Sequence, residues 1–262
     1  MKRTEISVDI TDFPIPFRSF LQNASVFDSS CSPEARVFFI EKDGGYYLKR
    51  APRGMLEKEA AQARYFHTLG LSAAVLDYRV DGAHDWLLTA RVAGEDCTHA
   101  VYLSDPARLC DLIATRLRAL HEMDATDCPV RNHTARYVET VEQNHRKGMF
   151  DPAFLPPVMG DISKNEAFSY FEAHKHLLKT NTLLHGDYCL PNILLDNWKF
   201  SGFIDLGNGG IGDRHVDLFW GAWTLAFNLG TDAYRDRFFD AYGRDRIDLD
   251  LVDLVGVAEC FG

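Results

Sequence analysis

A predicted β-hairpin with a polar residue at each end limits what this sequence can fold into more than any other feature. The apolar runs Ile193–Leu195 and Phe200–Ile204 flank the turn Asn197-Trp198-Lys199. Strands joined by a short turn pair antiparallel, so the residue before the first strand and the residue after the second lie at the same end. These residues are Asn192 and Asp205. Amide and carboxylate oxygens are ligands that Mg²⁺ prefers, with the remaining positions left to water and phosphate. The hairpin therefore predicts a magnesium site.

A further carboxylate, Asp187, lies five residues before Asn192 in the run HGDYCLPN. A carboxylate just ahead of a metal site can accept the proton of an attacking hydroxyl and orient that hydroxyl toward a γ-phosphorus. Phosphoryl transfer through a loose transition state needs little beyond this positioning and the neutralisation of charge. Any one of these residues alone is more often the cap of a turn. The ordered set of Asp187, Asn192 and Asp205 favours a phosphotransferase.

Short β-type runs fill the first ninety residues, with one helix among them. The turn Lys42-Asp43-Gly44-Gly45 is typical of a hairpin, because glycine tolerates positive φ. The helix Gly54–Leu69 carries one apolar stripe, made of Leu56, Ala60, Ala63 and Phe66. We expect a small antiparallel sheet covered by this helix, with strands at Val26-Phe27, Arg36–Glu41, Tyr46–Arg50, Ala74–Val80 and Asp85–Val92.

Helical periodicity takes over near residue 93. Asp105-Pro106 is a typical helix start. Six helices are predicted, at Ser104–Met123, Ala135–Arg146, Asn165–Leu178, Val216–Leu229, Asp232–Tyr242 and Leu249–Phe261. The predicted fold class is therefore α+β, with a sheet-based N-terminal lobe over residues 1–93 and a mainly helical C-terminal lobe over residues 94–262. Ligands often bind where two such lobes meet.

The overall charge and the cysteines narrow the choice of partner and compartment. A net charge of −10 argues against nucleic-acid binding and suits a small cationic substrate, although acidity also serves solubility alone. The six cysteines show no metal-binding spacing and predict free thiols in a reducing compartment. The longest apolar run falls short of the ~20 residues that span a bilayer, and the N-terminus lacks the core of a signal peptide. We expect a cytoplasmic monomer or weak dimer without a membrane partner.

One long stretch of sequence is familiar. LLHGDYCLPNILLDNWKFSGFIDLGNGGIGDRHVDL, residues 183–218, resembles the bacterial aminoglycoside phosphotransferases, and most of all their 3′-hydroxyl-phosphorylating (kanamycin kinase) group. LHEMDATDCP (120–129) and DWLLTARVAGED (85–96) extend the likeness over nearly the whole chain. The resemblance implies a bilobal protein-kinase-like fold, with ATP as the phosphate donor and GTP as the alternative. It makes Asp187 the catalytic base and Asn192 and Asp205 the Mg²⁺ ligands, while His185 and Gly186 shape the loop.

The resemblance also points to residues that would bind the nucleotide. Lys49 would contact the α- and β-phosphates, although its position alone would favour a solvated lysine on an edge strand. Glu59 would orient Lys49, with Glu57 as a substitute half a turn away. The first ninety residues contain no GxGxxG motif, so a serine-containing loop, Asp28–Ser32 with Ser30 in it, would cover the phosphates.

Three further residues are predicted to hold the base of the nucleotide. Tyr47 matches a position whose ring can stack on adenine. Arg91 and Val92, in the segment between the lobes, would offer a backbone carbonyl and a backbone N–H to the edge of the base. Main-chain contacts barely constrain the side chain, so these assignments rest on the resemblance.

For the acceptor, the resemblance implies a cationic aminoglycoside held by carboxylates through charge-assisted hydrogen bonds. Asp187 would supply one carboxylate, Asp151 and Asp161 others from a helical insert at about 130–178, and Glu259 the last near the C-terminus. The chain departs from the family pattern in two places. It has Asn208 where arginine is usual, and the run Ala258-Glu259-Cys260-Phe261-Gly262 has one acid where two are usual.

Alternatives to this function remain open from the sequence. The chain could phosphorylate another small alcohol, such as an amino alcohol or a sugar, or it could be a catalytically inactive nucleotide-binding sensor. The aromatic-rich segment Leu218–Leu229 could present a sugar-stacking face, but a buried core helix is the favoured interpretation.

Overall fold

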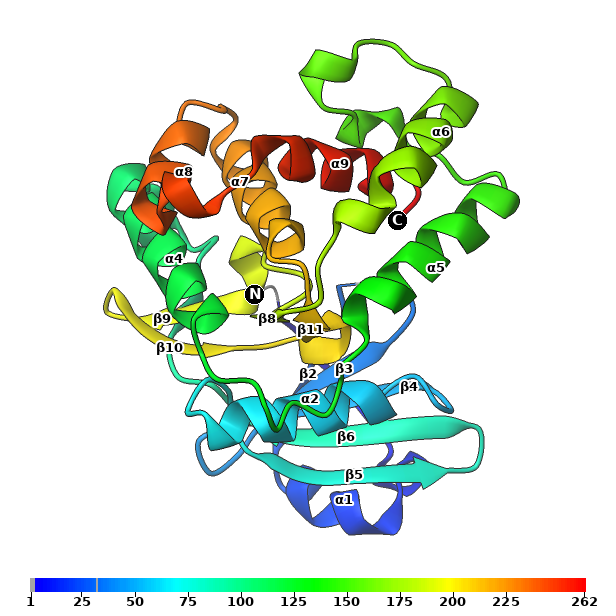
Figure 1. Ribbon diagram of the computed structural model, residues 1–262. Coiled ribbons are helices and arrows are strands. Elements are labelled where there is room, and N and C mark those ends of the chain that lie inside the picture. Colours follow the sequence, from blue (N-terminus) through cyan, green and yellow to red (C-terminus); the bar gives the residue numbers. More distant parts are fainter. Residues whose placement is uncertain (1–2, 32) are drawn as a thin grey trace. The chain divides into compact units, whose positions relative to one another are not determined.

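The computed structural model describes residues 3–31 and 33–262 (Figure 1). Ser32, which belongs to the predicted phosphate-covering loop, lies outside the described residues. The chain divides into two compact units. The first comprises Met1–His99 and Pro191–Gly207, and the second comprises Ala100–Leu190 and Asn208–Gly262. The first segment ends close to the boundary expected near residue 93, and the hairpin of the predicted metal site clusters with it.

The first unit is built on a six-stranded antiparallel sheet with the order β1-β2-β3-β4-β6-β5. Its strands are β1 Thr4–Ile6, β2 Ser25–Asp28, β3 Arg36–Glu41, β4 Tyr46–Pro52, β5 Val75–Asp81 and β6 His84–Ala90. Successive side chains of a strand point to opposite faces. Leu88 accordingly packs in the cluster that contains Phe17 of helix α1 (Ile15–Leu21), and Leu87 packs against Ala60 of helix α2 (Glu57–Thr68). The two helices cover opposite faces of the sheet (Figure 1).

A second, three-stranded sheet of this unit contains the predicted hairpin. Strand β9 (Ile193–Asp196) pairs with β10 (Lys199–Phe203) on one side and with β7 (Glu95–Asp96) on the other. Asn197 and Trp198 both have positive φ, +50° and +64°, which gives a turn the twist that suits a hairpin. Phe203 lies opposite Ile193, and the Ile204 N–H donates to the Asn192 carbonyl at 3.1 Å. Asn192 and Asp205 therefore flank the same end of the hairpin.

The second unit is mainly helical. Its helices are α3 Ala100–Leu103, α4 Pro106–His121, α5 His133–Arg146, α6 Lys164–His174, α7 His215–Leu229, α8 Arg235–Tyr242 and α9 Leu249–Glu259. Strand β8 (Thr182–Leu184) pairs with β11 (Gly210–Gly212). Asp105 caps α4 by accepting from the Arg108 N–H, and Pro106 occupies the first turn. The α+β class and the six predicted helices are confirmed.

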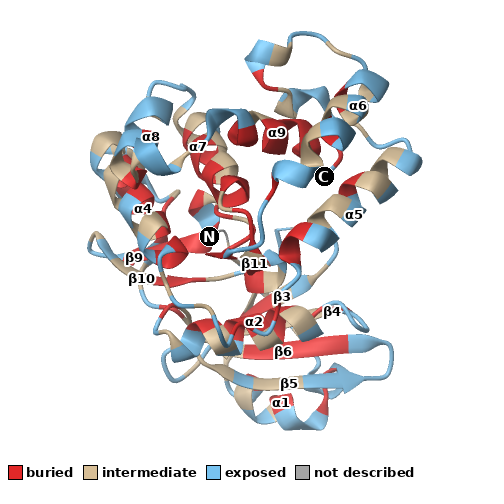
Figure 2. Cartoon of the chain, viewed as in Figure 1, coloured by how far each residue is buried: buried red, intermediate tan, exposed pale blue. Residues whose placement is uncertain are grey.

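The core of the second unit gathers around α9. Figure 2 shows this helix buried along nearly its whole length. Phe171 of α6, Val216 of α7 and Val255 of α9 belong to one buried cluster. No helix among the described residues is long and apolar enough to cross a membrane.

Candidate active site

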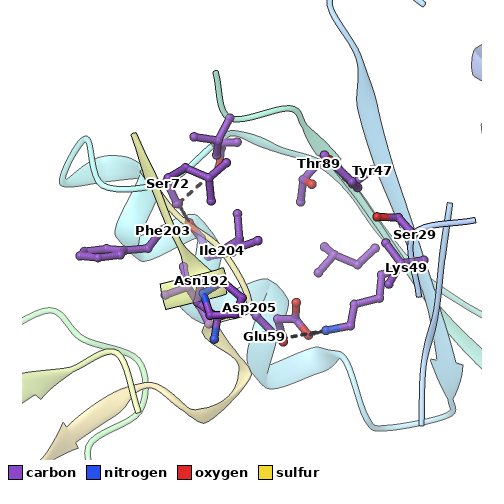
Figure 3. Close-up of a pocket in the computed structure, with 18 of the residues that line it drawn as sticks. Ser29, Tyr47, Lys49, Glu59, Ser72, Thr89, Asn192, Phe203, Ile204 and Asp205 are labelled. Carbon is purple, nitrogen blue, oxygen red and sulfur yellow. Dashed lines mark hydrogen bonds and ion pairs between the residues drawn. The ribbon is translucent and has the colours of Figure 1, made fainter. Parts of the chain in front are cut away.

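The first unit contains a cavity of about 260 Å³ with an apolar wall and a charged end (Figure 3). Its apolar lining includes Val37, Leu87, Leu194 and Phe203. Six residues that the sequence singles out also line it, namely Tyr47, Lys49, Glu59, Val92, Asn192 and Asp205. A largely apolar cavity with a few convergent polar groups is the usual form of a small-molecule site.

Lys49 of β4 lies at the charged end and pairs with two carboxylates. Its Nζ lies 2.8 Å from Glu59 Oε2 and 2.9 Å from Asp205 Oδ1. Figure 3 shows the side chain pointing toward Glu59. Burial alone would lower the pKa of Lys49, but the nearby charges of Glu59 and Asp205 outweigh it and raise this pKa. The ammonium therefore stays protonated. Glu57, the alternative partner, is exposed, so Glu59 is the residue that pairs with Lys49.

Two local features place the carboxylates. Asp85 of β6 accepts hydrogen bonds from the Gly54 and Leu56 N–H groups at 3.0 and 2.9 Å, which fixes the start of α2 and with it Glu59. Burial raises the pKa of Glu59, and the charge of Lys49 works against that shift. Asp205 has a φ of +56°, a left-handed conformation that aspartate tolerates better than most residues. Strained backbone of this kind gathers at functional sites.

The other residues predicted to bind nucleotide have different surroundings. The Tyr47 ring lies 5.1 Å from the Phe39 ring, and its hydroxyl accepts from Arg3 at 2.6 Å. Ser30 does not line the cavity; its hydroxyl accepts from the Val37 N–H at 2.9 Å. The neighbouring Ser29 and Cys31 do line it.

Arg91 and Val92, the two residues predicted to contact the edge of the base, follow β6. The Arg91 N–H donates to the Gly45 carbonyl at 3.0 Å, so of its two main-chain groups the carbonyl is the one left for a ligand. Val92 lines the cavity.

In the second unit, Asp187 is half-buried on the loop after β8. The backbone ahead of it is held by Asp217 of α7, which accepts from the His185 and Gly186 N–H groups at 2.8 Å each. Gly186 has a φ of +84°, and a Cβ there would lie 2.1 Å from the Asn208 carbonyl oxygen. Only glycine fits this position. The loop that presents Asp187 is therefore fixed by the Asp217 carboxylate and by the tight backbone approach at Gly186.

Asp217 is a positioning residue that the sequence analysis did not identify. It is fully buried, and His121 Nε2 lies 3.2 Å from its carboxylate. Burial alone would raise the pKa of Asp217, but the hydrogen bond and charge of His121 and the Gly186 N–H outweigh it and lower this pKa. The signal in the sequence is a carboxylate between the apolar residues Val216 and Leu218 of a helix, where an unpaired charge would be costly.

The predicted acceptor residues do not all gather at one place. Glu259 is buried at the end of α9, where its Oε1 accepts from the Tyr137 hydroxyl at 2.8 Å and from Trp220 Nε1 at 3.2 Å. Burial raises the pKa of Glu259 to about 7, and the charge of Asp187 adds to this shift. Asp151 caps a 3₁₀ turn through the Ala153 N–H at 2.9 Å. Its own N–H donates to the Cys260 carbonyl at 2.7 Å.

Two further residues named from the sequence are exposed. Asp161 lies on the loop before α6, and Asn208, one of the departures from the family pattern, follows the hairpin segment. No hydrogen bond recorded in the described part of the chain ties the Asp161 side chain to Glu259.

Helix α7 is neither wholly core nor wholly surface. Leu218, Ala222 and Leu225 are buried on one side. Trp220 and Trp223 are only partly buried, and Phe227 is 70% exposed. The core-helix interpretation therefore describes only one side of α7, and the sugar-stacking interpretation stays a prediction.

Comparison with known proteins identifies the family. The model of the phosphotransferase enzyme family matches residues 28–253. A probable aminoglycoside 3′-phosphotransferase of Lactococcus lactis is 51% identical over 258 residues, 98% of each chain. A streptomycin 3″-kinase of Streptomyces griseus is 32% identical over 221 residues, 79% of this chain and 80% of that protein.

Solved structures agree with the sequence comparison. An aminoglycoside phosphotransferase of Streptomyces rimosus superposes with a TM-score of 0.77 at 25% identity, over 97% of this chain and 99% of that one. A second structure of that enzyme, with ADP and streptomycin, gives a TM-score of 0.74. An aminoglycoside-3′-phosphotransferase of type VIII shares the fold at a TM-score of 0.79. The predicted kinase-like architecture is thus that of known phosphotransferases, and the chain belongs to the aminoglycoside phosphotransferase family.

Proposed function

We propose that this enzyme transfers the γ-phosphate of ATP to a hydroxyl of an aminoglycoside, most readily the 3′-hydroxyl. The observation that carries the proposal is the Lys49 ammonium held 2.8 Å from Glu59 and 2.9 Å from Asp205 at the polar end of an apolar cavity. A nucleoside triphosphate requires a fixed cation for its phosphates and an apolar cavity for its base, and this arrangement offers both. The 51% identity to a probable 3′-phosphotransferase supports the 3′ position.

The residues present fit a nucleotide and its magnesium. The apolar lining suits a purine, which would lie near Tyr47 and against Val92, with the Arg91 carbonyl toward the edge of the base. Lys49 would contact the α- and β-phosphates, and Ser30 would act through the conformation of its loop. Asn192 and Asp205 supply one amide and one carboxylate oxygen, the few protein ligands typical of a magnesium–nucleotide site. Among the described residues, no group of three or more His, Cys, Asp or Glu side chains is placed to hold a metal ion, so the proposed site relies on Asn192 and Asp205 together with the nucleotide.

The bound metal would neutralise charge on the phosphates during transfer. Asp187 acts as the general base, because its loop is anchored by Asp217 and its carboxylate is only half-buried. The proton of the hydroxyl moves to Asp187 Oδ as the oxygen bonds to the γ-phosphorus, and ADP leaves. GTP is the alternative donor.

Carboxylates would hold the cationic acceptor in the helical unit. Glu259 and Asp187 act near each other there, and Asp151 is tied by its backbone to Cys260, the residue after Glu259. Asp161 would contribute from the loop of the insert. The net charge of −10 favours the approach of a polycation. The six free cysteines and the use of ATP fit an enzyme that acts in the cytoplasm. A monomer or weak dimer remains our prediction for its oligomeric state.

An acceptor screen in a coupled ADP-release assay tests the proposal. We expect turnover with kanamycin and neomycin, and mass spectrometry should find one added phosphate on the aminoglycoside. An aminoglycoside that lacks the 3′-hydroxyl is the matched negative control. Activity with an amino alcohol or a simple sugar and none with aminoglycosides would replace the proposed acceptor. Nucleotide binding without turnover of any alcohol would favour a sensor.

A further inference from the structure

The partly exposed face of α7 carries an aromatic stripe, which we define as Trp220, Trp223 and Phe227. These residues recur at intervals of three and four and therefore lie on one face of the helix. The Phe227 ring stacks on the Trp223 ring with centroids 4.9 Å apart and planes 13° apart. Phe227 is 70% exposed, so core packing does not account for it. Three large aromatic side chains that are together partly exposed on one helix face form a candidate binding surface.

One end of the aromatic stripe reaches the residues that would hold the acceptor. Trp220 Nε1 donates to Glu259 Oε1 at 3.2 Å, and the Trp220 and Trp223 rings lie 5.3 Å apart, nearly perpendicular. The ring of Phe154, from the insert, lies 5.7 Å from the rings of both tryptophans. Neighbouring aromatic rings therefore form a continuous series from the buried Glu259 carboxyl group to the exposed Phe227 ring.

The same helix also contacts the loop of Asp187. Thr224 Oγ1 accepts from the Leu190 N–H at 3.1 Å, three residues beyond Asp187. Thr224 follows Trp223 directly and precedes Phe227 by less than one turn. The aromatic stripe and the loop of the proposed base are therefore held by adjacent positions of one helix.

We infer that Trp223 and Phe227 form a stacking surface for a pyranose ring of the acceptor. The inference rests on the proposed function, because it assigns part of the acceptor site. The C–H face of a pyranose is apolar and carries a slight positive charge, so it complements the negative face of an aromatic ring. Ammonium groups on the sugar strengthen this attraction. Recognition would thus combine carboxylates at one end of the site with stacking at the other.

A second copy of the chain is a poorer occupant for this surface. A large aromatic side chain buries about 150–250 Å², so two rings supply much less than the ~800 Å² per partner of a stable interface. One or two sugar rings match the size of the surface. The acidic charge of the protein also suits an amino sugar better than a second acidic copy.

Kinetics of Phe227→Leu and Trp223→Leu test the inference. Leucine keeps an apolar helix-forming side chain and removes only the ring. We expect the acceptor KM to rise about 3- to 10-fold while kcat and the KM for ATP stay within twofold. Phe227→Tyr keeps an aromatic ring and should therefore show the wild-type acceptor KM. Val158→Ala, which trims another apolar side chain that is 77% exposed, is the matched control and should leave all constants unchanged.

A direct contact can be observed by saturation-transfer NMR. Irradiation of aromatic protons should saturate pyranose C–H protons with the wild type and much less with Phe227→Leu. An unchanged acceptor KM in both leucine variants would overturn the inference. So would a change of oligomeric state in Phe227→Leu at constant KM, which would make the stripe an interface between copies. Failure of the wild type to phosphorylate any aminoglycoside would instead overturn the proposed function, and with it this inference, before a variant is made.

Discussion

Lys49 and Asp205 are 156 residues apart in the sequence, yet Lys49 Nζ lies 2.9 Å from Asp205 Oδ1. The contact joins the sheet that carries Lys49 to the hairpin that presents the proposed metal ligands. Both residues belong to one compact unit. The contact pre-organises the charged end of the cavity, because Lys49 offsets the negative charge of Asp205 and Glu59.

Replacement of Lys49 should therefore impair phosphate transfer. We expect Lys49→Met to lower kcat/KM for ATP about 10²- to 10³-fold, since it removes a fixed cation beside the phosphates. Steady-state ADP release measures the effect. Lys199→Met, at an exposed lysine of the same hairpin, is the control and should stay near wild type. A Lys49→Met enzyme within twofold of wild type would remove Lys49 from the site.

Loss of Asn192 should change the metal dependence. Asn192→Ala removes one of two protein oxygens, so half-maximal activity should need about tenfold more Mg²⁺. Activity titrated against MgCl₂ at saturating ATP gives this value. Asn165→Ala, at an exposed asparagine of α6, should keep the wild-type curve. Identical curves for Asn192→Ala and wild type would contradict the assignment of Asn192 as a ligand.

The buried carboxylate of Asp217 should matter for both stability and turnover. Asp217→Asn weakens the bonds to the His185 and Gly186 N–H groups, so we expect a loss of about 2–3 kcal/mol in the free energy of unfolding. Turnover should fall with it, because the Asp187 loop loosens. Urea unfolding and ADP release measure the two effects, with the exposed Asp232→Asn as the control.

The pH dependence of this effect has a definite sign. The pKa of Asp217 is lowered in the folded protein, so its charge stabilises the fold above its ordinary pKa of 3.8. The difference between wild type and Asp217→Asn should therefore shrink as the pH falls through that region. A difference that grows toward acid pH would contradict the assigned hydrogen bonds.

Glu259 predicts the opposite dependence. Its pKa rises from 4.5 to about 7 on folding, so the folded protein binds the extra proton between these values and loses stability as the pH rises through them. This shift corresponds to about 3 kcal/mol. Glu259→Gln should abolish that part of the pH dependence. Chemical unfolding at pH 5 and pH 8 tests this, and equal slopes for wild type and Glu259→Gln would contradict it.

The sequence predicted most elements because their signals are local. The hairpin at residues 193–203 has a turn with two positive φ values between apolar strands, and α4 has an Asp-Pro start. Helix α1 was not predicted, since it has only seven residues and too few turns to show a period. Its two buried residues, Phe17 and Leu21, pack against the six-stranded sheet.

The site divides in the same way. Residues in contiguous motifs could be named from the sequence. The sequence left Glu59 and Glu57 as alternative partners of Lys49, and the structure shows that the partner is Glu59. Asp217 was missed because its role depends on backbone N–H groups of a distant loop, which carry no side-chain signature. The exposure of Phe227 depends on which elements pack around α7. The apolar periodicity of α7 therefore could not distinguish its buried face from its exposed face.

The rate and nucleotide affinity of Asp187→Asn together test the central claim most directly. Asparagine keeps the size of the side chain and removes the group that accepts the proton. We predict that kcat falls about 10²- to 10⁴-fold while the Kd for ATP, measured by calorimetry, stays within threefold of wild type. An Asp187→Asn enzyme that turns over aminoglycosides at the wild-type rate would contradict the account.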